Sequence, residues 1–225
     1  MRKSLLALAV VSLCAMSASG SVVTTFTGGD AGEGLDMQGT FVYAINLAGI
    51  GGQVVGDATF THGAPDQGYA TAGFSKSSNI SLGKAPLYDF GSSANDTALE
   101  TLLWSNLSTY TYDTFSFDLA AGTYKIQVLS AEPYGAASRF VDLDFGNDGM
   151  IDCIMDSAAN GNIGMVATHT VTMATAGTYT IRYGNTIYPD IPLIQAATVE
   201  AITIPEPATM ALLALGVGAL IRRRK

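Results

Sequence analysis

The chain has 225 residues, of which 48% are hydrophobic and 13% charged, and its formal net charge is −8. Six of its eleven Lys and Arg lie within the first three and last four residues, so residues 21–203 carry five cations against eighteen carboxylates. Such an acidic body repels phosphate backbones, which argues against nucleic-acid binding. The length suits one domain with a tail at each end.

Residues 1–20, MRKSLLALAVVSLCAMSASG, have the three parts of a secretory signal: two cations, an apolar stretch and small residues. We expect the Sec machinery to export the chain and signal peptidase to remove this segment. An uncleaved anchor is the alternative, although the apolar stretch is short for one. Loss of Cys14 leaves Cys153 without a partner for an intrachain disulfide, and we expect it to be a small buried apolar residue.

Residues 21–203 are predicted to form an all-β extracellular domain. Short runs rich in Val, Ile, Thr, Phe and Tyr alternate with Gly, Asn, Asp and Pro, which is typical of a jelly roll or β-sandwich of about eight to ten strands. The expected strands are 22–27, 40–47, 53–61, 113–119, 123–131, 140–145, 150–155, 166–173, 178–183 and 196–204.

One stretch, NDTALETLLW, breaks the β pattern. Leu99, Leu102 and Leu103 recur at helical spacing after Asn95 or Asp96, either of which can cap a helix. We therefore predict one short helix packed over the edge of the sandwich.

The segment DLDFGNDGMIDCIMD, residues 142–156, is called the acidic hairpin below. A loop at 147–149, with Gly149 in the left-handed conformation, would pair Phe145 with Ile151 and Asp144 with Asp152. Like charges that face each other destabilise a strand pair, so the acidic face needs solvent or a cation. The predicted core face holds Val141, Leu143, Phe145, Ile151, Cys153 and Met155, and the acidic face holds Asp142, Asp144 and Asp152.

The same hairpin is similar in spacing to the start of a calcium loop of the type D-x-[DN]-x-[DN]-G-x-I-D. Gly146 stands where a ligating Asp or Asn belongs, and Met155 replaces the usual glutamate at the twelfth position. We expect no cofactor and an exposed hairpin; the alternative is Ca²⁺ bound by Asp142, Asp144, Asp148 and Asp152.

Common catalytic motifs are missing from the sequence. His62 and His169 are the only histidines and lie outside any metal-binding pattern, and there is no G-x-S-x-G motif or phosphate loop. Glu132 with a hairpin Asp could cleave a glycoside, but chance pairs are expected among so many acids. We predict a non-catalytic protein, with a secreted glycan-active hydrolase as the alternative.

The C-terminal segment, residues 204–225, combines a rigid Pro-Glu-Pro, an apolar stretch and four cations. As a helix, residues 208–221 would span ~21 Å of the ~30 Å hydrocarbon layer. The basic end, Arg222, Arg223, Arg224 and Lys225, should stay in the cytoplasm, because cations beside a short span resist translocation. Pro205 and Pro207 place the start of the helix at the outer surface.

This tail, PEPATMALLALGVGALIRRRK, resembles the PEP-CTERM sorting tail of bacterial exported proteins. The resemblance implies that an exosortase, a membrane transpeptidase, recognises Pro205, Glu206 and Pro207 and cuts nearby. It also implies a Gram-negative-type envelope, a transient stay in the inner membrane, and delivery to the cell surface or an extracellular matrix that contains exopolysaccharide. An ordinary tail anchor is the alternative.

A second resemblance covers Phe117 to Gly149, FDLAAGTYKIQVLSAEPYGAASRFVDLDFGNDG, which is similar to the central strands of malectin-like and galactose-binding-like jelly rolls. In that family, aromatic residues in loops stack on sugar rings, and the resemblance carries this role over to Tyr134. A rim tyrosine that caps a strand is the alternative. Together these expectations describe an exported, non-catalytic surface or matrix protein associated with exopolysaccharide or adhesion.

Overall fold

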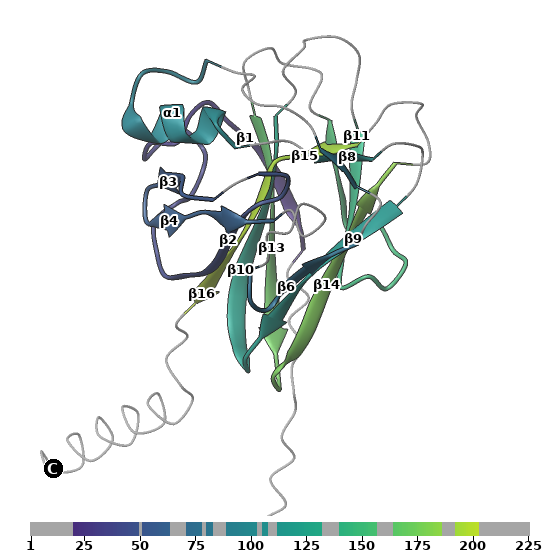
Figure 1. Cartoon of the computed structure of the whole chain (residues 1–225). Helices are drawn as coiled ribbons and strands as arrows, with labels where there is room; N and C mark the ends of the chain where they lie inside the picture. The colour runs from purple at the N-terminus through teal and green to yellow at the C-terminus, as the bar shows by residue number, and fades with distance from the viewer. Residues whose placement is uncertain are drawn as a thin grey trace, which may run out of the picture.

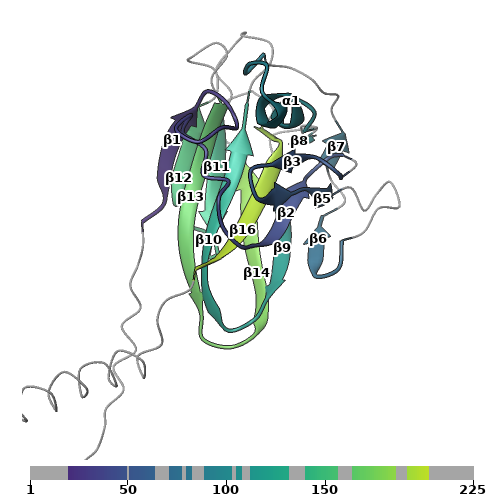
Figure 2. The ribbon, with the colours of Figure 1, turned by 90° about the vertical axis from the view of Figure 1, so that its left-hand side faces the viewer.

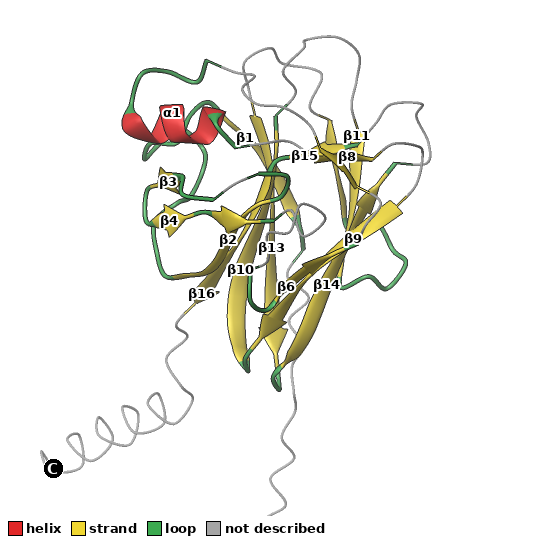
Figure 3. Ribbon diagram, viewed as in Figure 1, coloured by secondary structure: helices red, strands yellow, loops and turns green. Residues whose placement is uncertain are grey.

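The computed structural model consists of two facing β-sheets, with a further layer of chain over one of them (Figures 1 and 3). The residues that it describes are 20–49, 51–63, 71–77, 80–82, 89–102, 105–107, 112–131, 140–156, 164–185 and 192–202. Within them, no helix is long and apolar enough to cross a membrane. Residues 1–19 of the predicted signal (1–20) and the whole predicted tail (204–225) lie outside the described residues.

The larger sheet has six strands and is antiparallel except for its last pair, in which β2 and β5 run parallel. In spatial order its strands are β1 (Val22–Phe26), β13 (Gly164–Met173), β10 (Gly122–Ser130), β16 (Ala196–Ile202), β2 (Phe41–Asn46) and β5 (Thr61–His62).

The facing sheet has five antiparallel strands. Two smaller sheets complete the fold. The five strands are β12 (Cys153–Asp156), β11 (Phe140–Phe145), β14 (Gly177–Gly184), β9 (Tyr112–Leu119) and β6 (Phe74–Lys76); the smaller sheets are β15 (Leu193–Ile194), β8 (Ser105–Leu107) and β7 (Ile80–Leu82), and the pair β3 (Val54–Val55) and β4 (Ala58–Thr59).

The predicted all-β jelly-roll class is confirmed, and nine of the described strands have four residues or more. One predicted strand, 53–61, is wrong, because it folds into the β3–β4 hairpin and then β5. The hairpin turns at Gly56-Asp57, and Gly56 has a φ of 57°. A glycine with positive φ at the first position of a two-residue loop is what a tight hairpin favours.

The main core lies between the two sheets and follows from the alternation of side chains along each strand. In β9, for example, Phe115, Phe117 and Leu119 are buried while Ser116 and Asp118 face outward. Phe115 and Phe117 meet edge to face, with ring centroids 5.8 Å apart. The five-stranded sheet therefore has one apolar and one polar face.

The six-stranded sheet is instead apolar on both faces, because a second core covers its outer side. Ala44, Leu129, Val166 and Ala196 of four of its strands pack there, next to neighbours that point into the main core. The covering layer consists of residues 27–40, the β3–β4 hairpin and helix α1 (Ala94–Glu100), which lies over the upper end of the sheet (Figure 2).

The predicted helix is present, but the predicted cap is wrong. Ser93 is the N-cap: its hydroxyl accepts the Asp96 N–H, and the Asp96 side chain returns a bond to the Ser93 N–H. This reciprocal pair is a capping box. Leu99 and Leu102 then bury the helix against the outer core rather than over an edge of the sandwich.

Candidate functional site

The acidic hairpin has the predicted register. Leu143 pairs with Cys153 and Val141 with Met155, in line with the expected pairing of Phe145 with Ile151. Gly149 has a φ of 95°, as predicted, and Asn147 also lies in the left-handed region, with a φ of 56°. The regular pairing ends earlier than expected, because the Asp152 side chain accepts the Phe145 N–H at 2.6 Å.

The core face of the hairpin is confirmed except at one position. Val141, Leu143 and Met155 are fully buried, but Ile151 is 39% exposed, since it belongs to the loop before β12. Cys153 is half-buried, and burial, with the nearby negative charge of Asp152, raises the pKa of its thiol to about 12. The thiol therefore stays protonated at neutral pH.

On the other face, the prediction of an exposed hairpin holds for Asp148 and Asp152, which are exposed, and is wrong for Asp142 and Asp144. Asp142 is 2% exposed and Asp144 fully buried. Asp144 accepts hydrogen bonds from the backbone N–H groups of Asp148 and Gly149, both at 3.0 Å, and its Oδ2 lies 2.8 Å from a terminal nitrogen of Arg182. The cation that this face needs is therefore Arg182 of β14, directly across from Asp144 in the sheet.

Asp142 lies one row further along the same sheet. Its register partner on β14 is Gly184, and the residue beyond that, on β9, is Tyr112, whose hydroxyl donates to the Asp142 carboxylate at 3.1 Å. The Arg182 guanidinium stands 4.3 Å from the centre of the Tyr112 ring, a cation–π contact. Burial raises the pKa of Asp142 above its ordinary value, although the Tyr112 hydrogen bond opposes this shift.

All four residues proposed as calcium ligands are thus engaged by the protein. Asp148, the remaining one, accepts the Met150 N–H at 2.8 Å. Among the described residues, three carboxylates come close together elsewhere, at Asp30, Glu33 and Asp96, where one oxygen of each lies within 4.8 Å of the others. We call this group the carboxylate joint.

The carboxylate joint attaches α1 to the loop after β1. Asp96 accepts the Gly29 N–H at 2.9 Å, Glu33 accepts the Asp30 N–H at 2.8 Å, and Asp30 accepts an amide proton of Asn95 at 2.7 Å. Burial opposes ionisation of Asp96, but hydrogen bonds from Gly29 and Ser93 hold its pKa below the ordinary value. A sequence reading missed this joint, because Asp96 is 63 residues or more from its partners.

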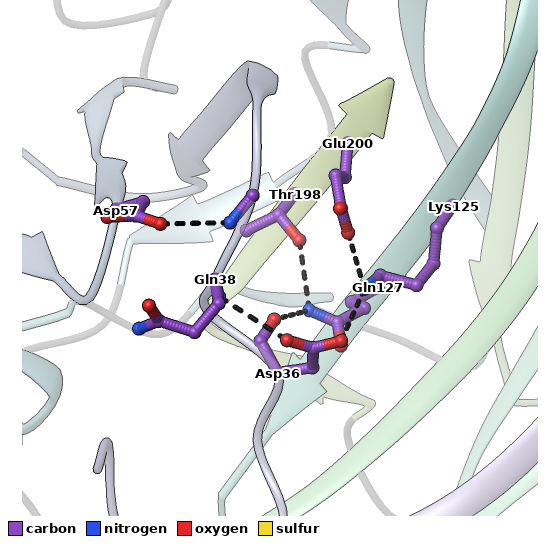
Figure 4. A network of polar contacts seen from close by, with 8 residues as sticks. Asp36, Gln38, Asp57, Lys125, Gln127, Thr198 and Glu200 are labelled. Carbon is purple, nitrogen blue, oxygen red and sulfur yellow. Dashed lines mark hydrogen bonds and ion pairs between the residues drawn. The ribbon is translucent and has the colours of Figure 1, made fainter. Parts of the chain in front are cut away.

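A third polar group fixes the covering layer to the sheet lower down (Figure 4). Lys125 of β10 forms ion pairs with Asp36, at 2.6 Å, and with Glu200 of β16. Gln127, beside it on the same face, donates to the backbone carbonyl of Asp36 at 2.8 Å. Burial lowers the pKa of Lys125, but the two ion pairs outweigh this effect and raise the pKa above its ordinary value. Lys125 is therefore charged at neutral pH.

The outer layer also leaves a pocket of about 340 Å³ where β4 separates from β2. One of its lining residues, Ala44 of β2, is buried. Its walls carry aromatic, hydroxyl and carboxylate side chains, and the full lining is Phe41, Val42, Tyr43, Ala44, Asp57, Thr59, Thr61, Thr71 and Ala72. Nothing in the sequence reading pointed to this group, because its residues come from three separate segments. We call this pocket the fork.

The remaining predicted site residues lie outside the described part of the chain. These residues are Tyr134, Glu132, the processing residues Pro205, Glu206 and Pro207, and the basic end Arg222, Arg223, Arg224 and Lys225.

Comparison with family models finds the PEP-CTERM protein-sorting motif at residues 203–225. This motif implies an exported protein sorted by an exosortase and anchored transiently in the membrane. No curated protein matches the chain.

Solved structures with the same fold include the ANX1 ectodomain and the ANXUR2 extracellular domain of Arabidopsis thaliana, at 13% and 10% identity and TM-scores of 0.53 and 0.54. These matches cover 79% and 73% of this chain but only 53% and 49% of the matched chains. A calcium-binding mutant of Bacteroides uniformis beta-glucuronidase 2 matches at 13% identity and a TM-score of 0.52, over 72% of this chain and 18% of the enzyme. The likeness establishes the jelly-roll fold.

Proposed function

We propose that the protein is an exported surface or matrix component whose jelly roll holds exopolysaccharide without cleaving it. A signal at residues 1–20 directs Sec export, and signal peptidase removes it. An exosortase of a Gram-negative-type envelope then cuts near Pro205, Glu206 and Pro207, while the apolar segment 208–221 and the basic end hold the chain briefly in the inner membrane.

The observation that carries this proposal is the joining of a sorting motif to a jelly roll in one chain. Ile202, the last described residue, pairs with Thr123 at the end of the sandwich where β10 begins. The tail therefore continues from that end, and α1 lies toward the opposite end (Figure 1). A sandwich attached in this way would present its sides and far end to the surrounding matrix.

A glycan-active hydrolase remains the alternative, but no observation on the described residues favours it. In the acidic hairpin, Asp142, Asp144, Asp148 and Asp152 each accept a hydrogen bond from the protein itself. Its proposed partner, Glu132, lies outside the described residues.

The test is to incubate the exported protein, purified in a non-glycosidic detergent, with exopolysaccharide purified from its host. We expect the protein to sediment with the polysaccharide and no oligosaccharide to be released, whereas heat-unfolded protein should stay in solution. Release of new reducing ends would favour the hydrolase. If the protein neither sediments with the polysaccharide nor releases product, the proposed association with the polysaccharide is contradicted.

A further inference from the structure

The fork opens at the edge of the six-stranded sheet. β5 pairs with only the last two residues of β2, Ile45 and Asn46, and β4 turns away to pair with β3. Within the described chain, Phe41 to Ala44 therefore have β16 on one side and the fork on the other. The β2–β5 pairing closes one end of the pocket, so an added β-strand could not run through it.

A β-bulge shapes the fork from within β2. Tyr43 pairs with Val199 and Phe41 with Glu200, so Val42 is the extra residue and is 45% exposed. A bulge turns the side chains beyond it to the other face. Phe41 accordingly packs on the outer core, while Tyr43 packs on the main core, 5.2 Å from the ring of Phe117. An aromatic residue thus stands at either side of the bulge.

The opposite wall approaches closely because of a glycine. Gly73 has a φ of 73°, and a Cβ there would collide with the hydroxyl of Tyr43. That hydroxyl donates to the Asp118 carbonyl at 2.9 Å, which holds the Tyr43 ring in place. Thr71 and Ala72 can therefore lie against the pocket, and the fork is fixed on both sides.

The polar groups of the fork mainly accept hydrogen bonds. Thr71 donates its proton to the His62 carbonyl at 2.7 Å, which leaves lone pairs on its oxygen. One carboxylate oxygen of Asp57 accepts the Gly39 N–H at 3.0 Å, which leaves the other for a ligand. Thr59 adds an exposed hydroxyl. The described lining contains Asp57 but no Lys or Arg, which disfavours an anionic ligand.

We propose that the fork binds one neutral sugar ring of the polysaccharide; this inference rests on the proposed function. A sugar ring supplies the hydroxyl donors that the acceptors need, and its C–H groups can contact Val42 and the aromatic walls. The volume lies at the lower end of the ~300–1,000 Å³ typical of ligand pockets, which suits a single ring.

The test measures monosaccharide affinity by saturation-transfer NMR with glucose, galactose, mannose, xylose and glucuronate. We expect at least one neutral sugar to bind wild-type protein, and glucuronate to bind more weakly than glucose. Ala72→Trp, at an exposed rim position, should abolish binding by filling the pocket. Thr59→Val, which removes one hydroxyl, should weaken it about three- to tenfold.

The matched control is Thr24→Val, which replaces an exposed strand threonine at the opposite edge of the six-stranded sheet and should change nothing. Equal melting temperatures will show that all variants are folded. Polysaccharide retention by wild type with no neutral-sugar binding, or with binding unchanged in Ala72→Trp, would overturn the fork and leave the proposed function standing. If wild-type protein shows neither polysaccharide retention nor neutral-sugar binding, both the fork as a sugar site and the proposed function are overturned.

Discussion

The acidic hairpin and the carboxylate joint are both rich in carboxylates, yet they balance their charges differently. In the hairpin, the buried Asp144 faces a cation, Arg182, and two backbone N–H groups. In the joint, Asp96 is held by N–H groups and by the capping box at the start of α1. One region uses an ion pair across strands, whereas the other uses backbone donors of a loop and a helix start.

This difference shows that closely spaced acidic residues can have a structural role in a chain whose body has far more acids than bases. Both groups have the residue types of a calcium site, and both are accounted for by structural hydrogen bonds. A carboxylate can be buried when enough hydrogen-bond donors of the protein surround it, whether or not a ligand binds. The predictions below separate the two modes.

The largest effect is expected from Asp144→Ala, because it leaves the Arg182 guanidinium unpaired beside a buried position. We expect the free energy of unfolding to fall by about 3–5 kcal/mol, as for other broken buried ion pairs. Urea denaturation measures this change. Asp148→Ala, an exposed neighbour in the same loop, is the control and should lose less than about 1 kcal/mol. Equal losses would refute a special role for the ion pair.

Asp96→Ala should have the next largest effect, about 2–3 kcal/mol, since it removes the capping box and leaves the Gly29 N–H without its acceptor. Ser93→Ala tests the cap alone and should lose about 1 kcal/mol. If the two variants are equally stable in urea, the bond from Asp96 to the loop contributes nothing and the joint is only a helix cap.

The pH dependence should have opposite signs at the two regions. The pKa of Asp96 is lowered by its donors, so its contribution is present above the unfolded pKa near 4 and is lost as the pH falls through the folded pKa. The pKa of Asp142 is raised by burial, so this group favours folding when protonated and loses that contribution as the pH rises.

The measurement is the free energy of unfolding from pH 3 to pH 7 for wild type, Asp96→Asn and Asp142→Asn. Relative to wild type, Asp96→Asn should be most damaging at pH 7, and Asp142→Asn should be least damaging there. The same pH trend in both variants would mean that the environments of the two carboxyl groups have been assigned wrongly.

Calcium should have the smallest effect. Because protein donors already occupy both acidic regions, we expect the melting temperatures in EDTA and in millimolar Ca²⁺ to agree within about 1 °C. A rise of several degrees would instead reveal a calcium site. If this rise in melting temperature disappears in Glu33→Gln, the ion binds at the carboxylate joint. If it disappears in Asp148→Asn, the ion binds at the acidic hairpin.

Local pattern predicted much of this fold from sequence. The nine longer strands, the hairpin register and the conformation of Gly149 all follow from alternation and turn chemistry. The helix cap was also readable, because Ser93 and Asp96 have the spacing of a capping box, whereas our prediction placed the cap at Asn95 or Asp96.

The remaining features depend on contacts distant in sequence. Burial of Asp144 requires Arg182, which lies 38 residues away, and nothing local to the hairpin identifies it. The alternation that placed Asp142 and Asp144 on the outer face was right, but it could not show that Tyr112, Arg182 and the hairpin loop surround them. The fork likewise depends on a one-residue bulge in β2, and hydrophobic patterning does not reveal such a shift.

The most direct test of the central claim is the intact mass of the protein recovered from the host envelope and medium. The account predicts a mature chain that lacks the signal and ends near Pro205 to Pro207. When Glu206 is replaced by Ala, it predicts that the chain keeps its tail and accumulates in the inner membrane. A surface or secreted protein whose mass still includes the basic end through Lys225 would contradict it.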